Sequence, residues 1–373
     1  MNSTIIKWPG GKKSEYKYIK DIIPDYKRYV EPFFGGGGIF FQEKPNIAFI
    51  NDYNSLLMDF YRLVKNQDKK FKYHLKQFEH NWDNMDKFTK KIKEELSIMF
   101  QHYREDKLTE TKVDRQINKL LKDNVEEFNG IFDEEFAVDI EKMFNHIVKT
   151  VTAKIKRMKK VENKKNKKMP KEDIIKNIET GFTSGFYTHF RDILNDCNLN
   201  RKKLSKEKHI AVFYYIREFC YGSMFRYNSS GEFNIPYGGI SYNKKDFSSK
   251  IDRLFNKKIR KLFKNTKIYD LDFEKFINKI NLNKNDFVFF DPPYDTDFST
   301  YGGNPFDRKD HERLANVIEN MKAKCILIIK NTKFIDELYK DRGLEISSFE
   351  KLYSYNVRGR NNRETKHLII TNY

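Results

Sequence analysis

Residues 28–41 read RYVEPFFGGGGIFF, and this stretch decides the fold class of the chain. Its first four residues are typical of a short strand, which runs into Pro32. Four consecutive glycines, 35–38, then precede an apolar helix start at Ile39. Strand, glycine loop and helix in this order are typical of a nucleotide-binding α/β domain, so we predict an α/β fold.

The flanking sequence continues this pattern. The spacing of apolar residues predicts a helix over 14–23. A second strand, 47–50, is followed by Asp52, and Asn54 can cap a helix over 56–64. The acidic residue after the second strand is the next feature expected of such a domain.

The α/β pattern is interrupted and then returns. Long segments with helical spacing and few glycines or prolines fill most of the chain between residues 68 and 218. Further along, buried strands are predicted at 287–290 and 325–329, a helix at 311–321 and a short β-rich run at 368–370. The α/β domain is thus expected in two pieces.

We place these two pieces at 1–67 and 265–373, with a mainly helical insertion at 68–264. Within the insertion, residues 149–171 contain eleven basic residues and one acidic residue, Glu162. A run of this kind is either a solvated helix end or loop, or a contact to a DNA backbone.

Composition narrows the class of protein. The 373 residues carry 72 Lys and Arg against 53 Asp and Glu, a formal net charge of +19 that favours a polyanionic partner such as nucleic acid. The three cysteines are few and widely spaced, which excludes a disulfide framework and a CxxC site. No apolar run is long enough to span a membrane. We therefore expect a cytoplasmic protein without a membrane segment.

The strand at 287–290 ends in Asp291, Pro292, Pro293 and Tyr294. Prolines cannot donate hydrogen bonds to a sheet, so the acidic and aromatic side chains are expected to project from its carboxyl edge. A fixed carboxylate, freed carbonyls and an aromatic face can together hold a flat ring that bears an amine. The alternative is an ordinary turn at the end of a strand.

Other ligand-binding motifs are excluded by single residues. The glycine run fails the dinucleotide fingerprint at Phe40, and the GGK sequence at 10–12 fails the P-loop pattern at Ile6. The sequence has no HExxH, EF-hand or nucleophile-elbow pattern, so we expect neither a metal site nor a serine nucleophile. Asp52 remains suited to accept hydrogen bonds from ribose hydroxyls.

Five segments, in order, resemble the motifs of the Dam-type (α-group) DNA N6-adenine methyltransferases. They are KWPGGK at 7–12, EPFFGGG at 31–37, ND at 51–52, RYNSSGEFNIPYG at 226–238 and DPPY at 291–294. The resemblance implies a Rossmann-like mixed sheet flanked by helices, with an inserted, mainly helical DNA-recognition domain that carries a β-hairpin. It also implies S-adenosylmethionine as the cofactor and double-stranded DNA as the partner.

The resemblance further assigns roles to individual residues. Lys12 would lie near the methionine carboxylate of the cofactor and Asp52 would bind its ribose. Asp291 and the carbonyl of Pro292 would accept hydrogen bonds from the target adenine, and Tyr294 would stack on the flipped base. The full set of cofactor-binding residues implied is Trp8, Lys12, Glu31, Phe33, Gly35, Gly37, Asp52 and Asp291.

DNA contacts are implied for residues in and before the 226–238 segment. Tyr221 resembles the aromatic residue that wedges into the duplex, and Arg226 is expected to contact either a guanine or a phosphate. Residues 228–231 can form the turn of the hairpin. The full set of DNA-binding residues implied is Tyr221, Arg226, Asn228, Asn234 and Tyr237. Gly222 and Ser223 depart from the family pattern, so no recognition sequence is carried over.

The resemblance therefore predicts a site-specific DNA adenine N6-methyltransferase of a restriction-modification, orphan or phage system. A cognate restriction endonuclease is a candidate partner. One alternative is a methyltransferase of the same fold that acts on RNA or protein. Another is a catalytically silent DNA-binding relative, which the intact Lys12, Asp52, Asp291 and Tyr294 argue against. The 173 residues between Asp52 and Arg226 exceed what Dam-like enzymes usually carry, and no motif assigns a role to the excess.

Overall fold

A computed structural model describes residues 3–295, 306–352 and 364–373. The chain folds into two compact units. The α/β unit comprises Met1–Gln67, Phe225–Tyr227 and Leu254–Tyr373, and the helical unit comprises Asp68–Met224 and Asn228–Arg253.

The α/β unit begins its second large piece about eleven residues before the expected boundary at 265. The reason is helix α12 (Lys257–Phe263), whose last residue packs into the aromatic core of this unit. The ring of Phe263 lies 5.3 Å from Phe40 and 5.9 Å from Tyr61, measured between centroids.

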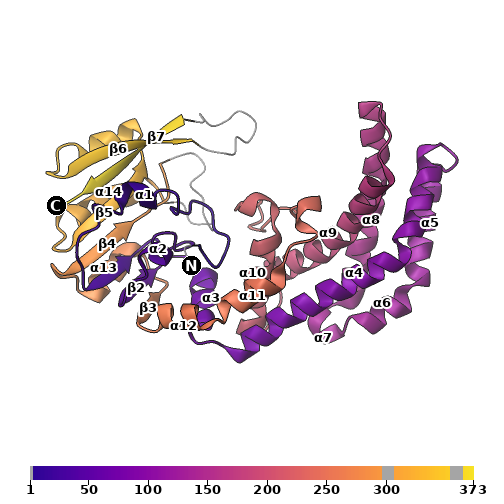
Figure 1. Ribbon diagram of the computed structural model, residues 1–373, viewed down its shortest axis with the longest axis horizontal. Helices are drawn as coiled ribbons and strands as arrows, with labels where there is room; N and C mark the ends of the chain where they lie inside the picture. The colour runs from indigo at the N-terminus through magenta and orange to yellow at the C-terminus, as the bar shows by residue number, and fades with distance from the viewer. Residues whose placement is uncertain (1–2, 296–305, 353–363) are drawn as a thin grey trace. The chain divides into compact units, whose positions relative to one another are not determined.

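The α/β unit is built on a seven-stranded mixed sheet with the order β3-β2-β1-β4-β5-β7-β6 (Figure 1). The first five strands of this order are parallel, whereas β7 runs antiparallel to both of its neighbours. The strands are β1 (Arg28–Glu31), β2 (Ala48–Asn51), β3 (Thr266–Tyr269), β4 (Asp286–Phe290), β5 (Lys324–Lys330), β6 (Glu345–Leu352) and β7 (Glu364–Thr371). This arrangement confirms the predicted fold class.

Central and edge strands differ in how well their sequences predicted them. The predicted strands at 28–31, 287–290 and 325–329 are β1, β4 and β5, and the last two are apolar runs buried in the sheet. The sequence signal for β3 and β6 is weak because both are edge strands with exposed polar residues such as Lys267 and Ser347.

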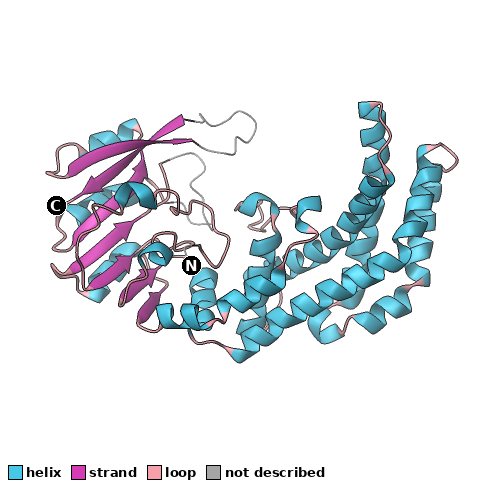
Figure 2. Ribbon diagram, in the orientation of Figure 1, coloured by secondary structure: helices cyan, strands magenta, loops and turns pink. Residues whose placement is uncertain are grey.

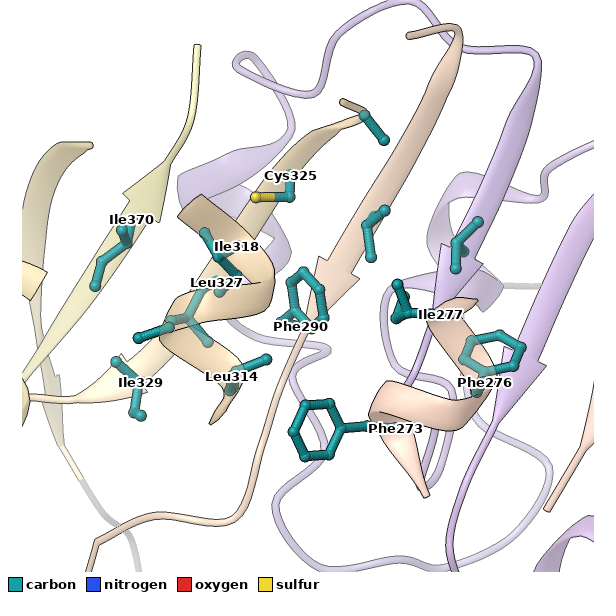
Figure 3. Packing of buried hydrophobic residues seen from close by; sticks show 14 of the residues in the cluster. Phe273, Phe276, Ile277, Phe290, Leu314, Ile318, Cys325, Leu327, Ile329 and Ile370 are labelled. Carbon is teal, nitrogen blue, oxygen red and sulfur yellow. The ribbon is translucent and has the colours of Figure 1, made fainter. Parts of the chain in front are cut away.

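Helices cover the sheet. On one face, α13 (Phe273–Ile280) and α14 (Arg308–Glu319) pack apolar side chains against β4 and β5 (Figure 3). The remaining helices of this unit are α1 (Tyr16–Ile19), α2 (Phe40–Glu43), α3 (Ser55–Lys65) and α15 (Lys333–Tyr339). Asn54 caps α3 as predicted, with its side chain accepting from the Leu57 amide. The helix predicted over 14–23 is only one turn long.

The helical unit contains long helices and no regular strand within its described residues (Figure 2). Its helices are α4 (Lys69–Arg104), α5 (Glu110–Asp123), α6 (Val125–Ile131), α7 (Glu134–Ala137), α8 (Ile140–Lys165), α9 (Lys171–Asn198), α10 (Lys206–Phe219) and α11 (Phe247–Leu254). Two 3-10 turns follow α10, at Tyr221–Ser223 and Ile240–Tyr242.

The hairpin expected here takes a reduced form. Its turn is present, with the Gly231 amide donating to the Asn228 carbonyl at 3.0 Å. Regular strands do not flank it, and an isolated antiparallel bridge pairs Cys220 with Tyr237.

The described residues include neither a membrane-spanning helix nor a cluster of metal-binding side chains. No helix among them is long and apolar enough to cross a membrane. Likewise, no group of three or more His, Cys, Asp or Glu side chains among them could hold a metal ion.

Candidate active site

Three carboxylates lie at one edge of the sheet. Glu31 ends β1, Asp52 directly follows β2, and Asp291 directly follows β4. These strands are parallel neighbours, so their carboxyl ends meet. The chain leaves β1 toward β2 and leaves β4 toward β5, in opposite directions along the sheet. Open α/β sheets bind their ligands at such a switch point.

Lys12 and Asp291 form an ion pair at this edge. The Lys12 side chain is only 2 % exposed and that of Asp291 is 17 % exposed. The same ammonium donates to the Gly10 carbonyl at 3.2 Å and lies 5.0 Å from the ring centroid of Tyr294. The KWPGGK and DPPY segments, 279 residues apart, therefore meet through one buried cation.

The glycine loop fits tightly against its surroundings. Gly35 and Gly37 adopt φ values of +49° and +69°, which L side chains rarely adopt. A Cβ atom at Gly35 would lie 2.9 Å from the Trp8 ring, and one at Gly37 would lie 2.6 Å from the Phe34 ring. Glycine is therefore required at both positions, and Trp8 lies directly on the loop.

Asp52 ties the loop to the second strand. Its Oδ2 accepts from the Gly35 amide at 2.8 Å and its Oδ1 accepts from the Asn54 amide at 2.9 Å. Burial raises the pKa of the Asp52 carboxyl, and these two backbone donors partly oppose that rise. The side chain is half-buried and keeps lone pairs for further donors, since a carboxylate has about four acceptor positions.

Two further buried residues support the glycine loop, and the sequence had assigned no role to either of them. The Tyr61 hydroxyl donates to the Gly35 carbonyl at 3.0 Å. The Asn51 side chain donates to the Pro32 carbonyl at 3.0 Å and accepts from the Leu271 amide at 2.8 Å. Tyr61 lies inside the predicted helix 56–64, so only its long-range contact distinguishes it from an ordinary core residue, whereas Asn51 belongs to the ND motif without an assigned role.

Glu31 is buried beneath this edge. It is 2 % exposed, and its Oε2 accepts from the Tyr29 hydroxyl at 2.7 Å. Burial raises the pKa of Glu31 well above its ordinary value, with the Tyr29 hydrogen bond opposing and the charges of Asp291 and Asp52 adding to the rise. The buried Glu31 side chain therefore has a structural role beneath this edge.

Phe33 provides an apolar wall. Its half-buried ring lies 5.4 Å from Phe273 and 5.5 Å from Phe306 between centroids, the second contact edge to face. Phe290, at the end of β4, lies 6.4 Å away. Aromatic side chains from α13, β4 and two loops thus surround the apolar half of the edge.

Tyr294 has an aromatic support of its own. Pro292 is buried, whereas Tyr294 is half-buried. The His367 ring of β7 lies 5.5 Å from the Tyr294 centroid, and it stacks in turn on Phe349 of β6 at 5.5 Å. His367 is fully buried and lies 73 residues along the chain, so no local sequence signal indicated this contact.

Arg226 belongs to the α/β unit together with Phe225 and Tyr227, whereas residues 228–238 belong to the helical unit. Its neighbour Phe225 packs edge to face on Trp8, with centroids 4.6 Å apart and planes at 61°. The Arg226 side chain is exposed. The residue expected to contact DNA is therefore anchored, through Phe225, to the residue that covers the glycine loop.

Tyr221 lies on a clamped turn in the helical unit. Its side chain is 42 % exposed, and the next two residues have positive φ values, +60° at Gly222 and +57° at Ser223. The buried Arg217 guanidinium donates to the Ser223 carbonyl at 2.7 Å and the Met224 carbonyl at 2.9 Å. Arg217 was not identified from the sequence, because its side chain follows an unremarkable helical pattern.

The other three residues for which the resemblance implies a DNA contact differ in exposure. The Asn228 side chain holds the turn, accepting from the amides of Ser230 and Glu232 at 3.0 and 2.9 Å. Asn234 is half-buried. Tyr237 is 7 % exposed and donates to Asn243 Oδ1 at 3.0 Å, which places it in the core of the helical unit.

Comparison with known proteins identifies relatives along the whole chain. The chain is 38 % identical to the type II methyltransferase M.CviBI of Paramecium bursaria Chlorella virus NC1A over 43 % of its length and 60 % of that relative. It is 27 % identical to the type II methyltransferase M.MjaIII of Methanocaldococcus jannaschii over 99 % of its length and 98 % of that relative. For M1.LlaDCHI of Lactococcus lactis subsp. cremoris the identity is 23 % over 98 % and 94 %.

Residues 8–179 and 158–355 match the sequence model of a family described as D12 class N6 adenine-specific DNA methyltransferase. The matched ranges include the glycine loop, the Asp52 carboxylate and the strand end at Asp291. The chain belongs to the D12 class N6 adenine-specific DNA methyltransferase family.

Proposed function

We propose that this protein transfers a methyl group from S-adenosylmethionine to N6 of an adenine turned out of duplex DNA, at a short recognition sequence. The carrying observation is the strand end at Asp291, which lies beside the glycine loop at the switch point of the sheet. At this edge, the Asp291 carboxylate and the half-buried ring of Tyr294 lie near the glycine loop and the Asp52 carboxylate.

The residues of the α/β unit fit the cofactor. Asp52 keeps acceptor capacity for ribose hydroxyls, and Trp8 and Phe33 supply apolar faces. Lys12 supplies the positive charge that a methionine carboxylate requires. When bound, the cofactor supplies an electrophilic methyl group on a sulfonium.

The chemistry explains why a carboxylate is needed. The exocyclic amine of adenine is conjugated with its ring and is a poor nucleophile. In this proposal Asp291 and the Pro292 carbonyl accept hydrogen bonds from its two hydrogens, which localises the nitrogen lone pair. Tyr294 stacks on the base and fixes its plane, and Asp291 takes the proton that the amine loses.

We also propose roles for the two units. The α/β unit is the catalytic domain and the helical unit, with its exposed Tyr221, is the target-recognition domain. We propose a cytoplasmic location for the activity and a cognate restriction endonuclease as a partner.

Asp291→Asn tests the catalytic assignment. The amide keeps one acceptor oxygen but loses the charge and the proton-accepting capacity, so we expect methyl transfer to duplex DNA to fall about 10²-fold or more. Affinity for S-adenosylmethionine should change little by comparison. The assay is transfer of radiolabelled methyl from the cofactor to duplex DNA.

The control is Asp341→Asn, since Asp341 is an exposed carboxylate after α15, and this variant should keep wild-type turnover. RNA and single-stranded DNA are assayed in parallel. Unchanged turnover in Asp291→Asn would remove Asp291 from the mechanism, and preferred transfer to RNA would replace the proposed substrate.

A further inference from the structure

We propose that a row of exposed cations on α8 and the turn after it binds the phosphate backbone of DNA, in addition to the contacts of the recognition turn. This inference rests on duplex DNA being the substrate. It assigns a role to the lysine-rich part of the insertion, for which the family resemblance supplies none.

The orientation of α8 is fixed by its inner face. Val151, Ile155 and Met158 are buried, and α8 packs along α9 (Figure 1). The contact is close, because a Cβ atom at Gly185 of α9 would lie 2.5 Å from the Ile147 Cα. The opposite face of α8 therefore has to point to solvent.

One group of cations in the 149–171 run is already neutralised. Lys156 pairs with Asp114 at 2.7 Å, and Lys159 pairs with Asp106 at 2.6 Å. Lys171, at the start of α9, pairs with Glu94 at 2.9 Å. These cations are therefore compensated by carboxylates of the helical unit itself.

A second group is exposed and forms no ion pair with any described residue. We call this group the α8 cationic row. It consists of Lys149, Arg157, Lys160, Lys164, Lys165, Lys167 and Lys168.

The single acidic residue of the run does not compensate the row. Glu162 is buried at 6 % exposure, accepts from the Met169 amide at 2.6 Å and faces Arg104 at 3.6 Å. The pKa of Lys154 is lowered chiefly by burial and further by the charge of Arg157. Like charges spaced three and four residues apart on a helix destabilise it, and a bound polyanion would relieve that repulsion.

The dimensions of the row suit a nucleic acid backbone. From residue 149 to 164 the helix rises about 22 Å at about 1.5 Å per residue. One DNA strand presents a phosphate about every 3.4 Å of helix axis, so the row spans about six phosphates. Long, flexible side chains in one line can follow such a backbone without reading its sequence.

The test removes three cations of the row at once, in the variant Arg157→Gln, Lys160→Gln and Lys164→Gln. A matched control removes three exposed cations at the amino-terminal edge of the sheet, Lys279→Gln, Lys284→Gln and Lys322→Gln, opposite the carboxyl edge that carries Asp291. Binding to a duplex without the recognition sequence is measured between about 50 and about 200 mM salt.

Each phosphate contact contributes about 0.9 to the slope of log affinity against log salt concentration. We therefore expect the row variant to lose about 2 to 3 from the slope and the control variant to keep the wild-type slope. A wild-type slope in the row variant would overturn the inference. Methyl transfer by wild type at low salt separates the two claims, because its absence counts against the proposed function and its presence leaves only the row in question.

Discussion

At the scale of single residues, the site depends on the pairing of Lys12 with Asp291. Both side chains are largely buried, so each depends on the other for charge compensation. The family resemblance gives Lys12 to the cofactor and Asp291 to the base, whereas here the two are joined to each other. Cofactor and base would therefore bind against a pair of opposite charges already in place.

Lys12→Met should lower the free energy of unfolding by about 3 kcal/mol, because it leaves a largely buried carboxylate without its cation. Urea unfolding followed by circular dichroism measures the change. Lys13→Met is the matched control, since Lys13 is the exposed neighbour and its loss should cost less than about 0.5 kcal/mol.

The double variant Lys12→Met with Asp291→Asn sharpens this result. With both charges removed, most of the lost stability should return, so the two changes should not be additive. Equal stability of Lys12→Met and wild type would show that the pair contributes nothing.

The sequence predicted which residues belong to the candidate site, but it did not predict the contacts between them. Asp52, Asp291, Tyr294 and the glycine loop stand out because prolines, glycines and strand ends leave local signals. The pairing of Lys12 with Asp291 joins positions 279 residues apart, and the support of Tyr294 by His367 depends on how β7 lies in the sheet. Such contacts have no local signature.

At the scale of elements, the turn after α10 depends on one buried guanidinium. Arg217 donates to two carbonyls of a turn whose residues Gly222 and Ser223 both have left-handed backbone conformations. Gly222 adopts this conformation freely, whereas Ser223 keeps it only when surrounding contacts hold it. The exposed side chain of Tyr221 would otherwise have several orientations.

Arg217→Met should weaken binding to cognate DNA about tenfold, which corresponds to about 1.4 kcal/mol. Affinity for S-adenosylmethionine should be unchanged, because the residues that we propose for cofactor binding belong to the α/β unit. Arg217→Lys keeps a buried cation with donors and should recover part of the affinity. An equal loss of cofactor and DNA affinity would instead indicate general unfolding.

Secondary-structure elements were predicted best from the sequence where their residues are fully buried. The central strands β4 and β5 were predicted from their continuous apolar runs and β1 from its place before the glycine loop, whereas β3 and β6 carry the mixed patterns of edge strands. The hairpin was predicted as a turn between short strands; the turn formed, closed by the Asn228 side chain, and its flanks carry only isolated bridge residues in place of regular strands.

At the scale of the whole molecule, the net charge of +19 separates into structural and available parts. Inner cations such as Lys156 and Lys159 are compensated by carboxylates of the helical unit itself, whereas the α8 cationic row faces solvent. Net charge alone therefore overstates what is available to a polyanion.

Stability should depend on pH through His189. Burial lowers the pKa of this histidine from 6.5 to about 4, while its hydrogen bond to the Ala137 carbonyl, 2.7 Å long, partly opposes the shift. Because the folded-state pKa is depressed, the unfolded chain binds the proton first. The stability is present above pH 6.5 and is lost as the pH falls toward 4.

Between about pH 7 and pH 5 we expect the free energy of unfolding to fall by about 2 kcal/mol from this group. Urea unfolding at both pH values measures the change. His189→Gln keeps a donor for Ala137 without a titrating ring, so its loss over the same interval should be smaller by about that amount. Identical pH dependence in both proteins would exclude His189 as the source.

The central claim is tested most directly by sequencing DNA from a host that lacks N6-methyladenine and expresses this protein. Long-read sequencing that detects the modified base should find N6-methyladenine at nearly every copy of one short sequence, and the signal should vanish with Asp291→Asn. Absence of N6-methyladenine in cells that contain folded wild-type protein would contradict the account.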